Sequence, residues 1–378
     1  MSTTSKSPRK VLVAAWQVAK KTLPPYSHRC SPRKFTQHQL FAALVLKAFL
    51  NTDYRGLAQT LQDCGQWCQD IELKKVPHYT TFQKAAKRLL RSGSVNKLLG
   101  ETIRRVQGRK RKVPLAAIDS TGMESHHSSR YYVHRRSREP NVWQTTTYKR
   151  YPKLGILIDC SNHLILSYLI GQGPKPDTQE LEPTLAKSSS RVRIEWLTAD
   201  AGYDSESNHR FCREQKGIRS LIPPKQGRPT KKPAKGRYRR LMQTRFDKKR
   251  YGQRWQVETV MSMIKRRQSS ATSGRSHWSR RRDLMLMVLT HNIMILFRMR
   301  VFYRAAASPF RSPFRSETGF DQAARIFLAN KRIASRTIPP SHFSIVLGES
   351  REEPRYDPKL PPIKTATMRG RNSRRFAD

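Results

Sequence analysis

The sequence predicts an α/β protein in which a mixed β-sheet flanked by helices follows an all-helical module. Residues 36–107 place apolar side chains at helical spacing throughout. From Val113 onward, short apolar and β-branched runs alternate with helical segments, which is typical of a sheet covered by helices. A chain of 378 residues with 37% hydrophobic side chains can bury the cores of two or three domains.

The first helical segments are short and basic. TQHQLFAALVLKAFLN carries an apolar stripe, YRGLAQTLQDC follows an Asn-Thr-Asp start signal, and VPHYTTFQKAAKRLL begins after a proline with Thr80 or Thr81 placed as a cap. The last of these helices carries four cations: Lys84, Lys87, Arg88 and Arg91. A helix-turn-helix reader of DNA and a plain helical bundle both fit this pattern.

The sheet is predicted from five runs. VPLAAID is the first strand, and LGILID and HLILSYLI form a hairpin around a turn at 159–162. DTQELEPTLAKS is expected to be a helix with Asp177 and Glu180 at capping-box spacing. IEWLTAD is a further strand, DSESNHRFCREQKG a helix closed by Gly217, and IRSLIPP a strand that ends at two prolines.

The remainder of the chain divides into four parts. Residues 225–250 hold 12 basic side chains against the single acid Asp247 and are expected to form an exposed loop. YGQRWQVETVMSMIKRR then predicts an amphipathic helix, and LMLMVLTHNIMILF a buried core helix that is too short and too polar to span a membrane. Residues 301–378, rich in Pro, Ser and Arg, are expected to be largely disordered apart from a short helix near 321–335.

The charge identifies the class of partner. Seventy-five Lys and Arg against 27 Asp and Glu give a formal net charge of +48, far more than solubility requires. Because this charge is spread along the chain rather than confined to one amphipathic or juxtamembrane segment, nucleic acid is favoured over a membrane surface. Five scattered cysteines without a CxxC pair favour a reducing compartment over a disulfide framework or a structural zinc site.

Two aspartates end predicted strands. Asp119 follows VPLAAI and Asp200 follows IEWLTA, and a small-residue turn that contains glycine comes after each. The carboxyl ends of strands are where α/β sheets build their sites, and a glycine lets a ligand approach closely. The alternative is that either aspartate only caps a turn or helix.

One acid also stands on the predicted helix over 251–267. At about 100° per residue, Tyr251, Arg254, Glu258 and Lys265 share one face, opposite an apolar face. The alternative is a surface stripe on which Arg254 and Glu258 pair at i, i+4, worth only about 0.2–0.5 kcal/mol.

The stripe resembles the signature of one family. Its spacing, Y-x2-R-x3-E-x6-K, is that of DDE transposases of the fourth family of bacterial insertion sequences and its relatives. AAIDSTG and LTADAGYDS resemble the segments that hold the two aspartates in these proteins, and both precede the helix in the same order. YRGLAQTL, VPHYTTFQKAAKRL and LMLMVLTHNIMIL are also similar, so the resemblance spans about 35–300.

The resemblance implies an RNase H-like catalytic core and a metal-dependent mechanism. Asp119, Asp200 and Glu258 would be the catalytic residues and the ligands of two Mg²⁺ ions, with Mn²⁺ able to substitute and Asp119 bridging both ions. Hydrolysis at the transposon end would free a 3′ hydroxyl, which would then attack target DNA. Alternatives are an RNase H-like metal nuclease and a catalytically silent DNA-binding protein derived from a transposase.

The resemblance also implies DNA contacts. Arg254 and Lys265 would hold end phosphates, and Tyr251 would contact a phosphate or base. Trp143 is a candidate to stack on a flipped base, or it is a loop tryptophan folded onto the sheet. Further phosphate contacts are expected in the basic stretch, from Arg237, Arg239 and Arg240.

These expectations define the organisation and setting of the chain. Residues 1–35 would be a basic extension, 36–110 a helical DNA-binding domain, 111–300 the catalytic domain with the basic loop 225–250, and 301–378 the tail. The expected partner is double-stranded DNA, both the terminal inverted repeats and the target. The resemblance further implies a homodimer or larger assembly on DNA, without a membrane, in a prokaryotic cytoplasm and associated with the nucleoid.

Overall fold

The computed structural model describes residues 4–108, 112–125, 151–225 and 234–296. All of these residues lie in one compact unit, within Met1–Arg311. Trp143 and the tail over 301–378, with its expected helix near 321–335, lie outside the described residues.

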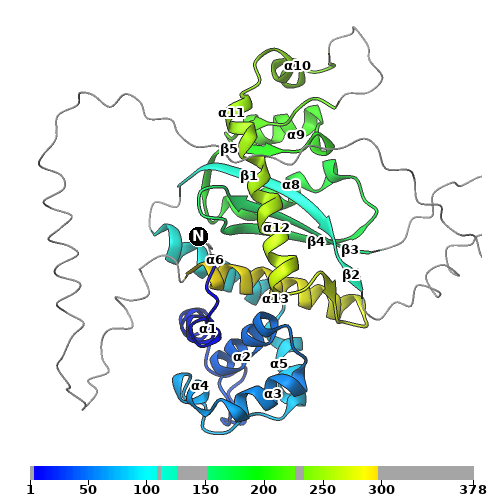
Figure 1. Cartoon of the computed structure of the whole chain (residues 1–378). Coiled ribbons are helices and arrows are strands. Elements are labelled where there is room, and N and C mark those ends of the chain that lie inside the picture. Colours follow the sequence, from blue (N-terminus) through cyan, green and yellow to red (C-terminus); the bar gives the residue numbers. More distant parts are fainter. Residues whose placement is uncertain (1–3, 109–111, 126–150, 226–233, 297–378) are drawn as a thin grey trace, which may run out of the picture. The chain divides into compact units, whose positions relative to one another are not determined.

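Helices alone make up the described chain before the first strand (Figure 1). They include all the helices expected over residues 36–107. Thr36 caps α2 and forms the full capping box with Gln39, while Asp53 caps α3 by accepting a hydrogen bond from Gly56 N at 2.6 Å. The six helices are α1 (Pro8–Thr22), α2 (Gln37–Leu50), α3 (Tyr54–Asp63), α4 (Gly65–Asp70), α5 (Tyr79–Leu89) and α6 (Ser92–Gln107).

Helix α1 lies within the interval 1–35, which the sequence led us to expect as an extension. It buries Val11, Leu12 and Val18 completely and packs against α2, α6 and α13 (His277–Leu296). Ser7 caps it, and Pro8 occupies its first turn, where a missing N–H costs nothing. The run VLVAAWQVA therefore supplies the buried face of α1, and the first helix is part of the folded unit.

A five-stranded mixed sheet follows, in the order β4-β3-β1-β5-β6. The hairpin of β3 and β4 and the pairing of β1 with β3 are antiparallel, whereas β1 with β5 and β5 with β6 are parallel. Each predicted strand is present. The bounds are β1 (Lys112–Gly122), β3 (Tyr151–Asp159), β4 (Ile165–Gly173), β5 (Arg193–Ala199) and β6 (Arg219–Leu221).

Two segments flanking the sheet differ from expectation. The helix expected over 251–267 is interrupted: α11 (Lys248–Tyr251) passes through the 3-10 turn η4 (Gly252–Arg254) into α12 (Trp255–Arg267). Glycine 252 has a low helix propensity, which fits a change of geometry there. The stretch 225–250, expected as a loop, contains the helix α10 (Arg237–Thr244), which buries Met242.

Helices cover the sheet. In Figure 1, α12 crosses the sheet in front of β1, and it contacts both β1 and β3. Helix α8 (Leu181–Ser189) packs on β3 and β4, and α9 (Glu206–Arg210) continues into the π-helical turn η3 (Phe211–Gln215) before β6. A second small sheet pairs β2 (Glu124–Ser125) with β7 (Ala271–Thr272).

Helix α13 confirms the buried core helix expected over 284–297. Every residue from Leu284 to Leu296 is buried, and the helix packs on α2, α6 and β4. The side chain of Asn292 on this helix has its hydrogen bonds satisfied. Its Nδ2 donates to Thr102 Oγ1 at 3.1 Å and to Ile165 O at 2.9 Å, and its Oδ1 accepts from Ile165 N at 2.9 Å. Across the described residues, none of the helices is long and apolar enough to cross a membrane.

Two buried histidines make the fold sensitive to acid. Burial lowers the pKa of both His209 and His291 to about 4. Unfolded histidines titrate near 6.5, so the unfolded chain binds protons first and stability falls as the pH drops from about 6.5 towards 4, by roughly 2 kcal/mol per histidine at pH 5. Urea unfolding at pH 7 and pH 5 measures this loss. The His209→Gln and His291→Gln variants should each lose less stability between pH 7 and pH 5 than the parent. The control His28→Gln, at an exposed position, should lose as much as the parent. An equal loss in all four proteins would contradict the assignment.

Candidate active site

The two strand-end aspartates are brought to neighbouring positions. The last parallel pair between β1 and β5 is Ile118 with Ala199, and Asp119 and Asp200 each come one residue later. Residues in register on adjacent parallel strands point to the same side, so the two carboxylates leave the sheet at the same level. Each carboxylate accepts the next backbone N–H at 2.7 Å, from Ser120 and Ala201.

The third acid, Glu258, lies on α12, directly after the turn η4. The turn η4 contacts the ends of β1 and β5, which places Arg254 over them. Arg254 Nη2 donates to Glu258 Oε1 at 2.6 Å, and its Nη1 lies 4.0 Å from Asp119 Oδ2. The arginine therefore stands between two of the acids, and the side chain of Glu258 is 54% exposed.

The electrostatics of Asp119 reflect the nearness of the other two acids. The pKa of Asp119 is raised to about 6, chiefly by burial, and the charges of Asp200 and Glu258 act in the same direction. The hydrogen bond from Ser120 and the charge of Arg254 act in the opposite direction. Asp119 is therefore a carboxylate at neutral pH that is only weakly acidic, and it would bind a cation readily.

The other residues of the predicted stripe lie around this cluster. Lys265 Nζ donates to Thr121 Oγ1 at 2.6 Å, which fastens α12 to the end of β1. Tyr251 packs against Phe246 with ring centroids 5.0 Å apart, and burial raises its pKa while Arg254 counteracts this. Trp255, which sequence reasoning did not single out, is 52% exposed beside Arg254.

A buried ion-pair network supports the first aspartate. Ser120 Oγ donates to Asp177 Oδ1 at 2.8 Å, and the ammonium of Lys153 binds Asp177 at 2.6 Å and Glu180 at 3.0 Å. Asp177 and Glu180 thus form ion pairs rather than the expected capping box. Burial alone would lower the pKa of Lys153, but the bonds to these two acids outweigh it and the net shift is upward. The sequence signal that could have indicated these ion pairs is a lysine, Lys153, next to the apolar residues of a strand.

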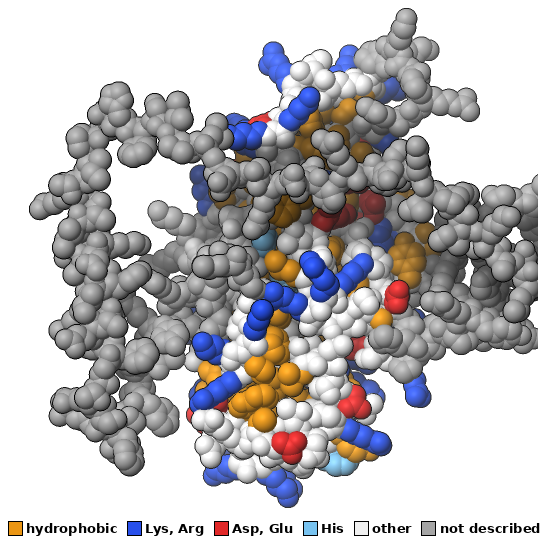
Figure 2. Space-filling view, viewed as in Figure 1, with side chains coloured by type: hydrophobic (Ala, Val, Ile, Leu, Met, Phe, Trp, Pro, Cys, Tyr) orange, Lys and Arg blue, Asp and Glu red, His pale blue; other side chains and the backbone are white. Residues whose placement is uncertain are grey.

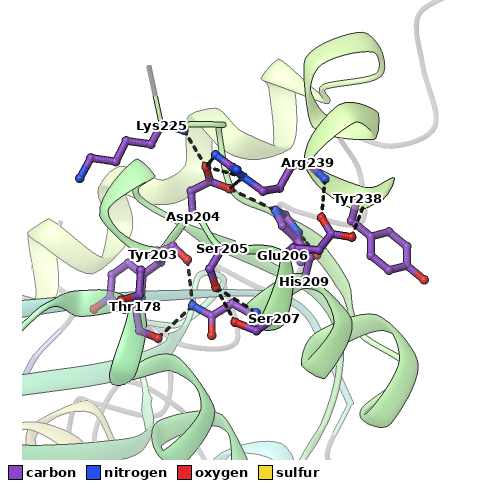
Figure 3. A network of polar contacts seen from close by, with 12 residues as sticks. Thr178, Tyr203, Asp204, Ser205, Glu206, Ser207, His209, Lys225, Tyr238 and Arg239 are labelled. Atoms are coloured by element: carbon purple, nitrogen blue, oxygen red, sulfur yellow. Dashed lines mark hydrogen bonds and ion pairs between the residues drawn. The ribbon is translucent and has the colours of Figure 1, made fainter. Parts of the chain in front are cut away.

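A second network fixes α10 (Figure 3). The fully buried carboxylate of Asp204 accepts from Arg239 Nη2 at 2.6 Å and from Lys225 N at 2.8 Å. Glu206 accepts from the backbone N–H groups of Tyr238 and Arg239 at the start of the helix, at 3.2 and 3.1 Å. Asp204 is thus an ion-pair partner, whereas Ser205 caps α9.

The basic residues expected to bind DNA are therefore not equivalent. The guanidinium of Arg239 is committed to Asp204, so its DNA contact stays a prediction and its visible role is to hold α10. Arg237 and Arg240 are exposed on the same helix. All five cysteines are free thiols. As the described side chains stand, no three His, Cys, Asp or Glu residues are grouped closely enough to hold a metal ion.

The carboxylate cluster lies in a part of the chain that matches a known protein family. Residues 110–293 match the family model described as the transposase DDE domain. This part of the chain is similar to a DDE transposase domain. The matched range contains Asp119, Asp200 and Glu258 and spans the five-stranded mixed sheet.

Two solved structures match this chain at low similarity. The crystal structure of the Mos1 strand transfer complex is 14% identical over 52% of this chain and 61% of that chain, with a TM-score of 0.19. The crystal structure of a pre-cleavage Mos1 transpososome is 14% identical over 78% of this chain and 86% of that chain, with a TM-score of 0.15. This chain thus spans about three fifths of the first of these relatives. Comparison with curated proteins gives no match.

Proposed function

We propose that the protein is the DNA transposase of an insertion sequence related to the fourth bacterial family. It would cleave DNA at the transposon ends and join the freed 3′ hydroxyl to target DNA. One observation carries the proposal: within a DDE domain, Asp119 and Asp200 lie at adjacent strand ends and Arg254 links Asp119 to Glu258. The family signature Y-x2-R-x3-E-x6-K names the same arginine and glutamate.

Asp119, Asp200 and Glu258 would hold two Mg²⁺ ions, for which Mn²⁺ may be exchanged in experiments. The donor set fits, because Mg²⁺ prefers carboxylate oxygens, and the cluster has more negative charge than Arg254 alone offsets. Glu258 is exposed enough to turn from Arg254 towards the aspartates. When bound, such ions activate the attacking oxygen and stabilise the leaving oxygen of an in-line displacement.

The chain's own residues would position the reacting DNA. Ser120 N–H fixes one oxygen of Asp119, and the Lys153 network holds Ser120 from behind. Arg254 carries a fixed positive charge at the carboxylate cluster, where it can hold a phosphate oxygen beside the scissile bond. Lys265 would have the same role two residues further along β1, at Thr121. Tyr251 would contact a phosphate or base of the same DNA end.

Joining of DNA separates this proposal from its nearest rivals. Incubation of a pre-cut transposon end with a supercoiled plasmid and Mg²⁺ is expected to give covalently joined products. Nicking of the plasmid without joining would favour an RNase H-like nuclease. A protein that binds the end but neither nicks nor joins, with Mg²⁺ or Mn²⁺, would be a silent transposase derivative.

The DNA partners follow from the same proposal. Two transposon ends must be held together before both are joined to a target, so a dimer or larger assembly on double-stranded DNA is proposed, in the prokaryotic cytoplasm and associated with the nucleoid. The net charge of +48 supports a polyanionic partner such as double-stranded DNA. Size-exclusion chromatography coupled to light scattering, with and without end DNA, reports the assembly directly.

A further inference from the structure

A cleft lined by basic side chains lies away from the carboxylate cluster. A cleft of about 940 Å³ is bounded on one side by the end of α2, α3 and α5, and on the other by residues 268–287, which follow α12. Five basic side chains line it: Lys47, Arg55, Lys87, Arg275 and Arg282. On the face seen in Figure 2, Lys and Arg side chains gather where α12 approaches α13.

The acids of the cleft do not cancel this charge. Asp53 and Asp283 are the two carboxylates in its lining. Asp53 already caps α3, and Asp283 accepts hydrogen bonds from Gly274 N at 2.9 Å and Ser273 Oγ at 3.3 Å. The lining therefore keeps an excess of three positive charges, five cations less two anions, and Arg55, Lys87 and Arg275 are exposed.

Aromatic rings accompany the cations. Lys47 Nζ lies 5.1 Å from the ring centre of Tyr54, and the guanidinium of Arg55 lies 4.9 Å from that of Tyr79, both within cation–π range. Trp278, between the lining residues Ser276 and Ser279, is 67% exposed. Cations interleaved with aromatic rings, together with serine hydroxyls, suit a phosphate backbone with nearby sugars and bases.

Helix α12 connects the cleft to the carboxylates. Glu258 stands in its first turn, and Gln268, directly after its last residue, lines the cleft. Ten helical residues span about 15 Å at 1.5 Å per residue, which corresponds to roughly four to five base pairs at 3.4 Å each. Lys265 lies between Glu258 and Gln268 on the same helix and adds a positive charge between the two sites.

We propose that this cleft binds the sugar-phosphate backbone of the DNA duplex whose end reacts at Asp119, about four to five base pairs inward from that end. The inference rests on the proposed function, because it takes the reacting duplex as the occupant. It adds a binding site that the family signature does not contain. The same residues would set the angle at which the duplex enters the carboxylate cluster.

Fluorescence anisotropy with a labelled duplex in EDTA tests the cleft without catalysis. The triple variant Arg55→Gln, Lys87→Gln, Arg275→Gln is expected to bind at least about tenfold more weakly, with a slope of log K against log salt reduced by about 0.9 for each phosphate that the variant no longer neutralises. The matched control removes three exposed lysines outside the cleft: Lys74→Gln, Lys75→Gln, Lys97→Gln. An equal weakening of binding in both variants would overturn the proposal.

Uncharged replacements of single DNA phosphates test where along the duplex the cleft binds. Methylphosphonates four to five nucleotides from the DNA end should weaken binding by the parent protein and have no further effect on the cleft variant. An equal effect on both proteins would place these phosphates elsewhere and overturn the inference. If the parent binds DNA and shows both effects but never joins it to a plasmid, the cleft stands and the proposed function fails. If the parent binds no DNA, both fail.

Discussion

Replacing Asp119 with Asn is expected to abolish strand joining while stabilising the metal-free protein. The loss of activity should be roughly 10³-fold or more, because a ligand that supports several kcal/mol of charge stabilisation in the transition state is removed. The gain in stability follows from the pKa of Asp119, which burial raises from 3.8 to about 6. Ionisation of this group above pH 6 destabilises the folded state, and a carboxamide carries no such cost.

The sign of this effect can be checked by pH. The variant should be more stable than the parent by about 1–3 kcal/mol at pH 7.5. The difference should shrink as the pH falls from 6 to 4, because Asp119 becomes protonated in the folded state while it is still partly ionised in the unfolded chain. Urea unfolding at the two pH values measures it. Asp63→Asn, at an exposed position, is the control and should change neither stability nor joining. A variant that is less stable than the parent at pH 7.5 would contradict the electrostatic account.

Removal of the Arg239 side chain is expected to destabilise the fold strongly while leaving Asp119, Asp200 and Glu258 intact. Arg239→Met leaves the carboxylate of Asp204, which is 0% exposed, without its cation. Breaking a buried ion pair from one side costs about 3–5 kcal/mol, because an uncompensated charge stays buried. Chemical unfolding of the purified variant gives the value.

The neighbouring residue supplies the matched control. Arg240→Met removes the same charge from the exposed side of α10 and should change stability by about 0.5 kcal/mol or less. Adding Asp204→Asn to Arg239→Met should recover part of the stability, since the amide needs no cation. If Arg239→Met and Arg240→Met unfold at the same urea concentration, the Asp204 pair does not hold α10 in solution.

Local patterns predicted much of the sheet and part of the site. Strand ends at Asp119 and Asp200 could be located because apolar runs stop at both and glycine-containing turns follow. The pairing of Arg254 with Glu258 follows from their spacing of four residues along a helix. Their approach to Asp119 depends on the parallel register of Ile118 with Ala199, which is a property of the assembled sheet.

The parts that sequence reasoning missed depend on contacts between distant residues. Lys153 joins Asp177 and Glu180 across 24 or more positions, and Arg239 joins Asp204 across 35. From their local spacing, Asp177 and Glu180 were expected to form a capping box, because an acid near the start of a helix suits a cap as well as an ion pair. The burial of α1 likewise arises from packing against α2, α6 and α13, which no local pattern records.

The central claim is that Asp119, Asp200 and Glu258 form one metal site. Crystals of the protein with a pre-cut DNA end, soaked in Mn²⁺, test it through the anomalous signal of the ion. The account predicts Mn²⁺ coordinated by oxygens of all three carboxylates, with Arg254 turned towards a DNA phosphate. Mn²⁺ bound instead by Asp177 and Glu180, or bound without Glu258, would contradict it.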